Sequence, residues 1–546
     1  MCHLCFPMPR LRSGNSETKY RHAEMIEIQP PSPETPPTRS VVEMIREAAR
    51  RDPNKEAMVC GDRRLTWAQF DARVNRVANA LLARGIGRGD NIAVLSPNSV
   101  PFAELFIGIT RAGACITPLS TMASADALHK MLLDCGAKAV FLADQYRSLT
   151  DPFLDRLDIV KVAIDFEASG FDDYQKMLDM AAETDPLVPV RMCDGINLIY
   201  SSGTTGTPKG ILHNHWMRAA QMDRVTANGY DDDARTLLST PLYSNTTIVS
   251  FLPTLVGGST VVLMPKFDAR AYLSLAEKER ITHTMLVPVQ YKRIMDVADF
   301  DRFDLSAMRV KFSTSAPLRS DVKADVLARF PGKLIEYYGL TEGGGVTVLV
   351  ADENPAKLHT VGVPAPNCDI RLIDEAGNEV APGQVGEICG RSPTMMAGYF
   401  GREDLTAEYI WRDEAGQVYF RSGDMGSFDK DGFLVLSDRK KDMIISGGLN
   451  IYANDLELVL LDDPDVADAA VIGVPSDQWG ETPLGLVVLR AGTERGGRDI
   501  CGRANERLGK SQRLSAVEIR DELPRSSIGK ILKRELRAPY WETATQ

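Results

Sequence analysis

The feature that most constrains the fold is a regular alternation of short apolar runs and amphipathic segments. Strand-like runs over Asn91–Leu95, Ala114–Pro118 and Ala139–Leu142 alternate with helical patterns over Trp67–Arg84 and Val100–Ala112. Continuous apolar runs are typical of strands that are buried on both faces. Strands that alternate with helices favour a largely parallel sheet covered by helices on both sides.

The pattern changes along the chain. The alternation resumes after residue 191, and from about residue 362 to 436 it gives way to short runs separated by hairpin turns such as Asp429-Lys430-Asp431-Gly432. A charged run over 438–442 then precedes a mixed region. The sequence predicts an α/β fold with a disordered tail (1–38), a large N-terminal domain of two α/β sheet lobes plus a small β-barrel (39–438) and a small α+β domain (442–546). The charged run between the two domains has no apolar residue to anchor it, so we expect it to be a linker.

The composition is consistent with two classes of protein, an enzyme or a binding protein. The 546 residues include 63 Lys or Arg and 74 Asp or Glu, a formal net charge of −11. Because nucleic-acid affinity comes from Lys and Arg on phosphates, we expect no nucleic-acid partner. Prolines and glycines interrupt the longest uncharged stretch, 236–265, so we expect no transmembrane segment. Scattered cysteines favour a cytoplasmic location, and the oligomeric state stays open, a homodimer included.

A glycine-rich segment carries the strongest local signal. The apolar run Leu198–Tyr200 leads into residues 201–210, SSGTTGTPKG. Small residues let backbone N–H groups approach an oxyanion, hydroxyls add donors, and the lysine adds charge. Pro208 stands where a Walker A loop needs glycine. The segment therefore predicts a phosphate-binding loop of another kind.

Three further segments carry chemistry. Residues 337–344, YYGLTEGG, put aromatic faces that can stack on a base beside Glu342, a lone carboxylate that suits Mg²⁺. Residues 421–424, RSGD, end in Asp424, which is either a ribose ligand or an ordinary turn aspartate. Lys530 follows a glycine turn, where it either reaches a phosphate or belongs to a solvated basic helix.

Together these segments resemble the adenylate-forming superfamily of acyl-CoA synthetases, nonribosomal adenylation domains and beetle luciferases. The resemblance covers residues 40–540 in order, including the hinge segment 438–457 and the loop 313–318, STSAPL. Within this superfamily, the sequence is most similar to a stand-alone AMP-forming acyl-CoA synthetase. The resemblance implies that a carboxylate attacks the α-phosphorus of MgATP, and that a thiol, usually of coenzyme A, then displaces AMP. The implied acid is a fatty or a cyclic or aromatic carboxylic acid.

The resemblance also implies a role for each matched residue. Thr204, Thr205 and Lys209 would hold the β- and γ-phosphates, Glu342 would hold Mg²⁺, and Lys530 would bridge the carboxylate and the α-phosphate. The residues implied to contact ATP or coenzyme A, or to form the hinge, are Ser201, Thr205, Gly206, Ser315, Ala316, Pro317, Tyr337, Tyr338, Gly339, Thr341, Asp424, Arg439, Lys441, Ser446, Gly447 and Gly448. The candidate acyl-pocket residues are Tyr243, Ser244, Asn245, Thr246, Met285, Ser313 and Thr314.

The family's C-terminal domain is mobile, and the resemblance implies that here the small mobile domain 442–546 rotates about a hinge at residues 439–441, which includes Lys441. This rotation would exchange Lys530 for the Ser446-Gly447-Gly448 loop. Ser244 stands where the family has a histidine, so the identity of the acid stays open. The alternatives are an adenylate-only ligase that passes the acyl group to a carrier protein, a luciferase-like oxygenase and an inactive binding protein. We interpret His213 and His215 as structural residues, because their spacing does not place both on one helix face.

Overall fold

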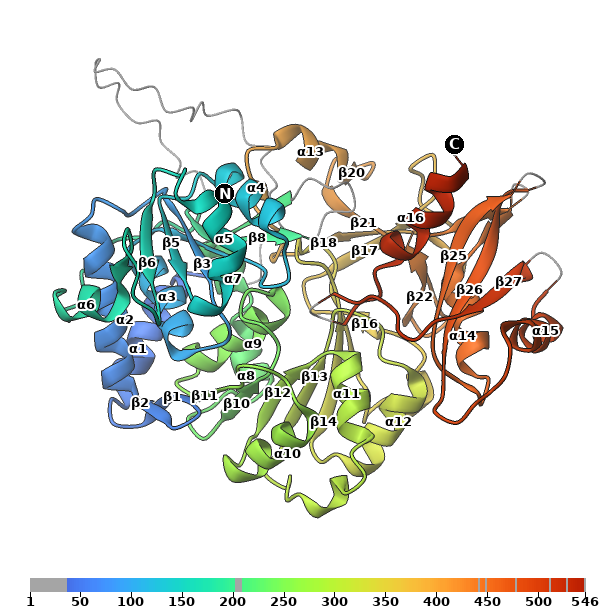
Figure 1. The fold of residues 1–546 in the computed structure, drawn as a ribbon, viewed down its shortest axis with the longest axis horizontal. Helices are drawn as coiled ribbons and strands as arrows, with labels where there is room; N and C mark the ends of the chain where they lie inside the picture. Colours follow the sequence, from blue (N-terminus) through green and yellow to red (C-terminus); the bar gives the residue numbers. More distant parts are fainter. Residues whose placement is uncertain are drawn as a thin grey trace.

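The computed structural model of the protein describes residues 37–201, 209–439, 442–446, 449–476, 479–509, 512–526 and 529–544. Two large sheets and a smaller one form the N-terminal body, and a fourth sheet with its helices lies beside it (Figure 1). The predicted α/β class is confirmed. Nearly all of the predicted tail, residues 1–36, lies outside the described residues.

The first large sheet has eight strands in the order β19-β9-β8-β4-β3-β5-β6-β7. Its central strands are parallel, and β8 and β9 form an antiparallel hairpin. The strands are β3 (Asn91–Leu95), β4 (Cys115–Pro118), β5 (Ala139–Leu142), β6 (Val160–Ala163), β7 (Asp172–Asp173), β8 (Gly195–Ser201), β9 (Lys209–Asn214) and β19 (Gly398–Tyr399). The helices of this region are α1 (Val41–Arg51), α2 (Trp67–Leu82), α3 (Val100–Arg111), α4 (Ala125–Asp134), α5 (Arg147–Leu154), α6 (Tyr174–Asp179) and α7 (His215–Ala220).

The second large sheet has nine strands in the order β16-β15-β14-β13-β12-β10-β11-β1-β2. The strands from β1 through β14 in this order are parallel. The strands are β1 (Glu56–Cys60), β2 (Arg63–Thr66), β10 (Arg235–Leu238), β11 (Thr260–Leu263), β12 (His283–Leu286), β13 (Val310–Ser313), β14 (Lys333–Tyr338), β15 (Thr347–Val350) and β16 (Val363–Pro364). The helices of this region are α8 (Asp223–Ala227), α9 (Asn245–Val256), α10 (Ala269–Lys278), α11 (Pro288–Met295) and α12 (Ser320–Arg329).

Helix caps and aromatic packing fix the central helices. Ser40 and Thr66 each form a capping box, which satisfies backbone donors at the starts of α1 and α2. Phe106 of α3 packs edge to face on Phe251 of α9, with ring centroids 5.6 Å apart. Because α3 follows a strand of the first sheet and α9 belongs to the second, this contact joins the two lobes.

The region predicted to form a small β-barrel is an antiparallel sheet, and the pairing of its described strands does not close into a barrel. The strands of this small sheet are β17 (Asp369–Ile373), β18 (Gly386–Arg391), β20 (Ile410–Arg412), β21 (Val418–Phe428) and β22 (Leu434–Arg439), and α13 (Glu403–Glu408) precedes β20. Strand β22 continues farther than the sequence suggests. Asp438 and Arg439, which the charge pattern assigns to a linker, pair with Met425 and Asp424 of β21. The ladder extends the strand because backbone pairing does not depend on the charges of the side chains.

The C-terminal domain is an α+β unit whose strands are β23 (Ile444–Ser446), β24 (Leu449–Ile451), β25 (Val466–Ser476), β26 (Gly480–Leu489) and β27 (Ala516–Ile519). Its helices are α14 (Ala453–Leu461), α15 (Gly497–Arg507) and α16 (Lys533–Ala544). Leu456, Leu460 and Ile500 pack with Val471 and Val487 in a core of its own. A separate core is what a domain needs in order to move as a unit.

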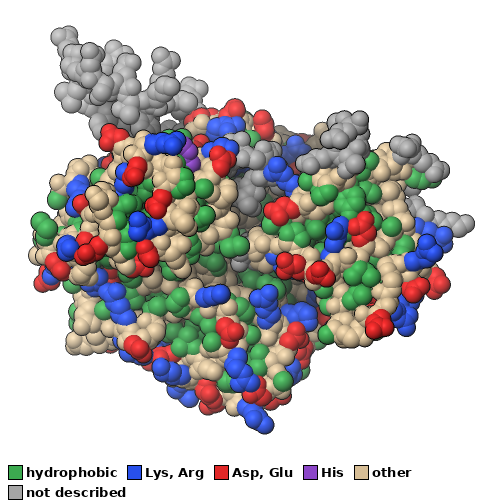
Figure 2. Space-filling model, in the orientation of Figure 1, with side chains coloured by type: hydrophobic (Ala, Val, Ile, Leu, Met, Phe, Trp, Pro, Cys, Tyr) green, Lys and Arg blue, Asp and Glu red, His purple; other side chains and the backbone are tan. Residues whose placement is uncertain are grey.

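Charged side chains of both signs are distributed over the surface, as the composition leads us to expect. Figure 2 shows basic and acidic side chains interspersed over the face that it displays. Among the described residues, no helix is long and apolar enough to cross a membrane.

Candidate active site

The predicted phosphate loop connects β8 and β9. Ser201 at the end of β8 pairs with Lys209 at the start of β9. Thr204, Thr205, Gly206 and the Ser201 side chain lie outside the described residues. The Lys209 Nζ donates to Tyr409 Oη at 3.1 Å, and it lies 4.9 Å from the centroid of that ring and 5.6 Å from the Tyr399 centroid. The aromatic faces hold the lysine cation in place at the base of the loop.

Glu342 is held close to this lysine through Tyr399. The Tyr399 Oη donates to Glu342 Oε1 at 2.9 Å, and the Glu342 carbonyl accepts from Met396 N at 2.8 Å. Burial, together with the Glu342 carboxylate, raises the pKa of Tyr399, so the phenol stays a donor. Among the described residues, no three acidic, histidine or cysteine side chains cluster as a protein-only metal site would require. A lone carboxylate fits Mg²⁺, which keeps waters and phosphate oxygens as its other ligands.

The predicted adenine and ribose residues meet where β14 approaches β21. The Tyr338 Oη donates to Asp424 Oδ2 at 2.9 Å, and Asp424 is only 7% exposed. Arg439 of β22 lies opposite Asp424 in the ladder, although its side chain lies outside the described part of the chain. The structure therefore brings together three residues that are up to 101 positions apart in sequence (439 − 338).

The loop after β13 has a strained residue at its centre. Ser315 adopts a φ of +81°, which is unusual for a residue other than glycine. Its Oγ lies 2.5 Å from Thr246 Oγ1 at the start of α9. This contact joins the predicted nucleotide loop (Ser315, Ala316 and Pro317) to the predicted acyl pocket, and strain of this kind is concentrated at functional sites.

The acyl-pocket candidates lie at the carboxyl ends of adjacent parallel strands and at the start of α9. Met285 on β12 pairs with Phe312 on β13, and Ser313 pairs with Leu286. Ser244 precedes α9 without a side-chain capping bond. Ligands bind at this edge of open parallel sheets. The candidates gathered here are Tyr243, Ser244, Asn245, Thr246, Met285, Ser313 and Thr314.

Polar atoms in this region include two without partners. The hydroxyls of Tyr243 and Ser313 are buried and have no hydrogen-bond partner among the described residues. Tyr337, in contrast, accepts from Asn228 Nδ2 at 3.3 Å and stacks on Phe312 with ring centroids 5.9 Å apart. Unpaired buried hydroxyls are uncommon and point to a functional region. Gly339 and Thr341 follow in the loop after β14.

Lys530 reaches the N-terminal body from the C-terminal domain. The segment that precedes α16 extends toward the second large sheet (Figure 1), and the backbone of Gly529 lies against the Val289 side chain at the start of α11. The Lys530 N–H donates to Ser526 Oγ at 3.1 Å, and Arg525 Nη1 donates to the Gly529 carbonyl at 2.6 Å. A loop built in this way carries Lys530 to the edge of the sheet where β12 ends.

The predicted hinge and thiol-channel residues are only partly described. Ser446 ends β23 and pairs with Gly480 of β26. Lys441, Gly447 and Gly448 lie outside the described residues.

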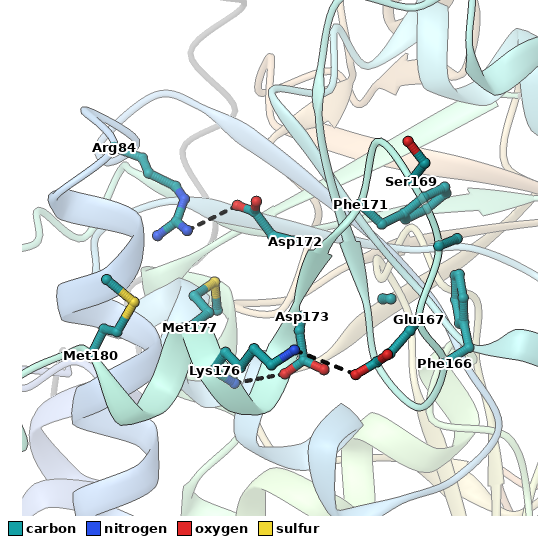
Figure 3. Close-up of a pocket in the computed structure, with 12 residues that line it drawn as sticks. Arg84, Phe166, Glu167, Ser169, Phe171, Asp172, Asp173, Lys176, Met177 and Met180 are labelled. Atoms are coloured by element: carbon teal, nitrogen blue, oxygen red, sulfur yellow. Dashed lines mark hydrogen bonds and ion pairs between the residues drawn. The ribbon is translucent and has the colours of Figure 1, made fainter.

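A hollow of about 590 Å³ lies elsewhere, at the β7 end of the first large sheet (Figure 3). Arg84 pairs with Asp172 at 2.9 Å, and Lys176 pairs with Glu167 at 3.4 Å across its walls. Strand β7 stands at the opposite end of this sheet from β9 and its phosphate loop. The hollow therefore does not belong to the candidate active site.

Sequence reasoning missed four residues of the site. Tyr399 lies on β19 of the first large sheet, and Tyr409 lies just before β20 of the small sheet. No local pattern in the sequence marks them as neighbours of Lys209 and Glu342. His213, interpreted as structural, is fully buried but lies 2.7 Å from the Thr341 carbonyl through Nε2. Arg218 is also fully buried and bonds to His213. The signal in the sequence is an arginine within the otherwise apolar run Trp216–Ala220.

Two protein-family models match the chain. The family model for AMP-binding enzymes matches residues 45–400, and the model for their C-terminal domain matches residues 455–530. The chain belongs to the AMP-binding enzyme family. It is an ATP-dependent, AMP-forming ligase of carboxylic acids.

Relatives match over almost their whole length. A feruloyl-CoA synthase of Amycolatopsis sp is 35% identical over 495 residues, which cover 90% of this chain and 97% of the relative. A long-chain-fatty-acid–CoA ligase of Mycobacterium tuberculosis is 32% identical over 506 residues, covering 92% and 98%. The crystal structure of ATP-bound MatB from Rhodopseudomonas palustris is 27% identical with a TM-score of 0.83, covering 92% of this chain and 99% of that chain.

Proposed function

We propose that the protein joins a fatty, cyclic or aromatic carboxylic acid to coenzyme A through an acyl-adenylate, at a site formed between the two domains. The observation that carries this proposal is the docking of the Gly529–Lys530 loop at the edge of the sheet where the acyl-pocket candidates gather. That arrangement supports a role for Lys530 in the adenylate-forming step. Relatives named for feruloyl-CoA and for long-chain fatty acids support an acid of one of these classes.

In the first step, charge neutralisation and alignment dominate, because two anions must meet. Lys209 and the loop residues Ser201, Thr204, Thr205 and Gly206 hold the β- and γ-phosphates. Lys530 lies between the carboxylate and the α-phosphate and draws them together, and Thr341 contacts the α-phosphate. Glu342 would hold Mg²⁺, which would neutralise further phosphate charge when bound.

The adenine and ribose of the nucleotide are held by a separate set of residues. Tyr338 lies against one face of the adenine, and Ala316 and Pro317 lie on the other. Asp424 accepts hydrogen bonds from the ribose hydroxyls with help from Arg439. The partly buried Tyr338–Asp424 hydrogen bond of 2.9 Å supports this role, because it orients both side chains before the nucleotide binds.

In the second step, the C-terminal domain rotates about residues 439–441. Rotation withdraws Lys530 and brings Ser446, Gly447 and Gly448 to the channel of the coenzyme A thiol. Glycines suit that channel, because a side chain would narrow it. The separate hydrophobic core of the C-terminal domain supports its movement as a unit. We also propose a cytoplasmic location, which the free thiols of the seven described cysteines support.

The test is a panel of carboxylic acids assayed with ATP and Mg²⁺ for AMP release and coenzyme A consumption. The proposal predicts acid-dependent AMP release that equals the coenzyme A consumed. AMP release without coenzyme A consumption would favour an adenylate-only ligase that serves a carrier protein, or a luciferase-like oxygenase if oxygen is consumed. Absence of AMP with every acid would favour an inactive binding protein.

A further inference from the structure

A buried chain of hydrogen bonds runs from the acyl pocket to the Thr341–Glu342 segment. Its centre is Arg218 of α7, which is 0% exposed. The Arg218 Nε donates to Asn197 Oδ1 at 2.9 Å, and its Nη1 donates to Gln221 Oε1 at 3.0 Å. Its Nη2 donates to His213 Nδ1 at 2.8 Å and to Asn245 Oδ1 at 3.0 Å. Every one of these acceptors is neutral, and among the described residues no carboxylate pairs with Arg218.

The hydrogen bond from Arg218 determines which ring nitrogen of His213 carries the proton. Because a guanidinium can only donate, the Nδ1 that faces it must be unprotonated. Asn197 Nδ2, which lies 2.9 Å from the same Nδ1, is therefore a second donor. The ring proton is on Nε2, which donates to the Thr341 carbonyl at 2.7 Å. Burial, together with the Arg218 cation, holds the pKa of His213 well below its ordinary value, so the ring stays neutral.

The His213 bond orients the peptide that leads into Glu342. Once the Thr341 carbonyl direction is fixed, the plane of the following peptide is fixed as well. On the far side of Glu342, its own carbonyl accepts from Met396 N at 2.8 Å, and its carboxylate accepts from Tyr399. Glu342 is therefore held from both sides, and the Arg218–His213 pair supplies the hold on the Thr341 side.

The opposite end of this series of hydrogen bonds presents a donor, the Asn245 amide, at the acyl pocket. Because Arg218 occupies the Asn245 oxygen, the Asn245 amide nitrogen must point away from Arg218. No described group accepts a hydrogen bond from that nitrogen. Asn245 is the first residue of α9 and follows Ser244, so its Nδ2 donor is available to an acceptor atom on the bound acid.

We infer that Arg218 and His213 are positioning residues that couple the binding of the acid at Asn245 to the alignment of Thr341 and Glu342 for adenylate formation. The inference rests on the proposed function. Arg218 is a buried cation that has no counter-ion among the described residues, an arrangement that costs free energy unless a nearby anion compensates it. The carboxylate of the acid and the phosphates of ATP, which bind beside this hydrogen-bond network, are such anions.

The first test replaces His213. In His213→Gln, the amide oxygen can accept from Arg218 while the amide nitrogen donates to the Thr341 carbonyl, whereas His213→Phe keeps a buried ring and loses both bonds. The matched control is His215→Phe, since His215 is equally buried and its ring nitrogens have no hydrogen-bond partner among the described residues. Thermal unfolding of all three variants checks that each one folds.

Acid-dependent exchange of pyrophosphate into ATP reports the adenylation step, with kcat and the KM for the acid measured separately. We expect His213→Phe to lower kcat roughly tenfold or more, and His213→Gln to stay within about threefold of the wild type. His215→Phe should retain kcat within about twofold. Equal losses in His213→Phe and His215→Phe, or equal losses in His213→Phe and His213→Gln, would overturn the inference.

The second test addresses the pocket end. Asn245→Asp keeps an oxygen for Arg218 but replaces the amide donor with an anion that repels the acid. We expect the KM for the acid to rise at least about tenfold while the KM for ATP changes less than about twofold. An unchanged KM for the acid would remove Asn245 from the coupled chain. If the wild type itself gives no acid-dependent exchange, the proposed function fails, which is a distinct outcome.

Discussion

Gly529 of the C-terminal domain lies directly against the side chain of Val289 in the N-terminal body. A Cβ at residue 529 would collide with Val289, and the φ of Gly529 is +77°. Glycine is therefore required here both for the backbone conformation and for the close approach. Since Lys530 is the next residue, this contact positions the lysine for which we propose a catalytic role.

We predict that Gly529→Ala impairs adenylate formation by about tenfold or more, because the added methyl pushes the loop off Val289. Gly492→Ala is the matched control: its φ is +85°, and nothing lies within 4 Å of the added Cβ. Both variants carry similar backbone strain, so only Gly529→Ala should lose pyrophosphate exchange. Equal activity in the two variants would mean that this docking contact is not needed for adenylation.

Lys530→Ala should separate the two half-reactions. Loss of the cation between the carboxylate and the α-phosphate should lower adenylate formation by about two orders of magnitude or more. Coenzyme A thioester formation from supplied acyl-adenylate should remain, because that step needs a different position of the C-terminal domain. Comparable loss in both half-reactions would contradict the role assigned to Lys530.

Lys441→Pro should have the opposite effect, because proline at the hinge restricts rotation of the backbone. Adenylate formation should persist while thioester formation from supplied acyl-adenylate falls by about tenfold or more. Single-turnover assays of each half-reaction measure both rates. Normal thioester formation in this variant would place the hinge elsewhere.

The Tyr338–Asp424 bond should matter to the nucleotide and not to the acid. Tyr338→Phe keeps the ring and removes the 2.9 Å hydrogen bond to Asp424, so Asp424 is held less firmly for ribose. We expect the KM for ATP to rise about three- to tenfold, while the KM for the acid is unchanged, as steady-state kinetics will measure. A rise in the KM for the acid alone would argue against the nucleotide role of this pair.

His215 should make the fold sensitive to mild acid. Burial lowers the pKa of His215 to about 4, although Asp194 and Glu43 oppose the shift. The unfolded chain, in which histidine has its ordinary pKa of about 6.5, therefore binds more protons between these two values. The free energy of unfolding consequently falls as the pH drops through this window, by up to about 3 kcal/mol from this group.

His215→Phe lacks this contribution, so the wild type should lose stability relative to the variant as the pH falls from 6.5 to 4. Unfolding midpoints of the two proteins at several pH values measure the difference. His213 and His283, whose pKa values are also lowered, are present in both proteins and cancel in the comparison. A constant difference across this pH range would mean that His215 does not titrate as expected.

Much of the fold follows from sequence patterns that act locally. The strands Asn91–Leu95 and Ala139–Leu142 have the predicted bounds, because continuous apolar runs identify doubly buried strands. The helix expected over Trp67–Arg84 ends at Leu82 instead, shortly before the chain turns through Gly85 at a φ of +71°. Boundaries depend on such backbone turns, which the apolar periodicity does not record.

Some residues of the candidate site can likewise be predicted from local sequence, and others cannot. Tyr338, Asp424 and Lys209 could be predicted because each belongs to a contiguous motif with its own chemistry. The tyrosines around Lys209 and the Arg218–His213 pair could not, because their significance comes from contacts between distant segments. Arg218 and Asn245 are 27 positions apart, and their bond exists only because α7 and the start of α9 meet in the folded chain.

Isotope transfer tests the central claim most directly. When an acid labelled with ¹⁸O in its carboxylate is converted to its coenzyme A thioester, attack of a carboxylate oxygen on the α-phosphorus leaves that oxygen on AMP. Mass spectrometry of the AMP should therefore find one ¹⁸O atom per molecule. Unlabelled AMP, or label released in inorganic phosphate with formation of ADP, would contradict an acyl-adenylate intermediate and with it the function proposed for this protein.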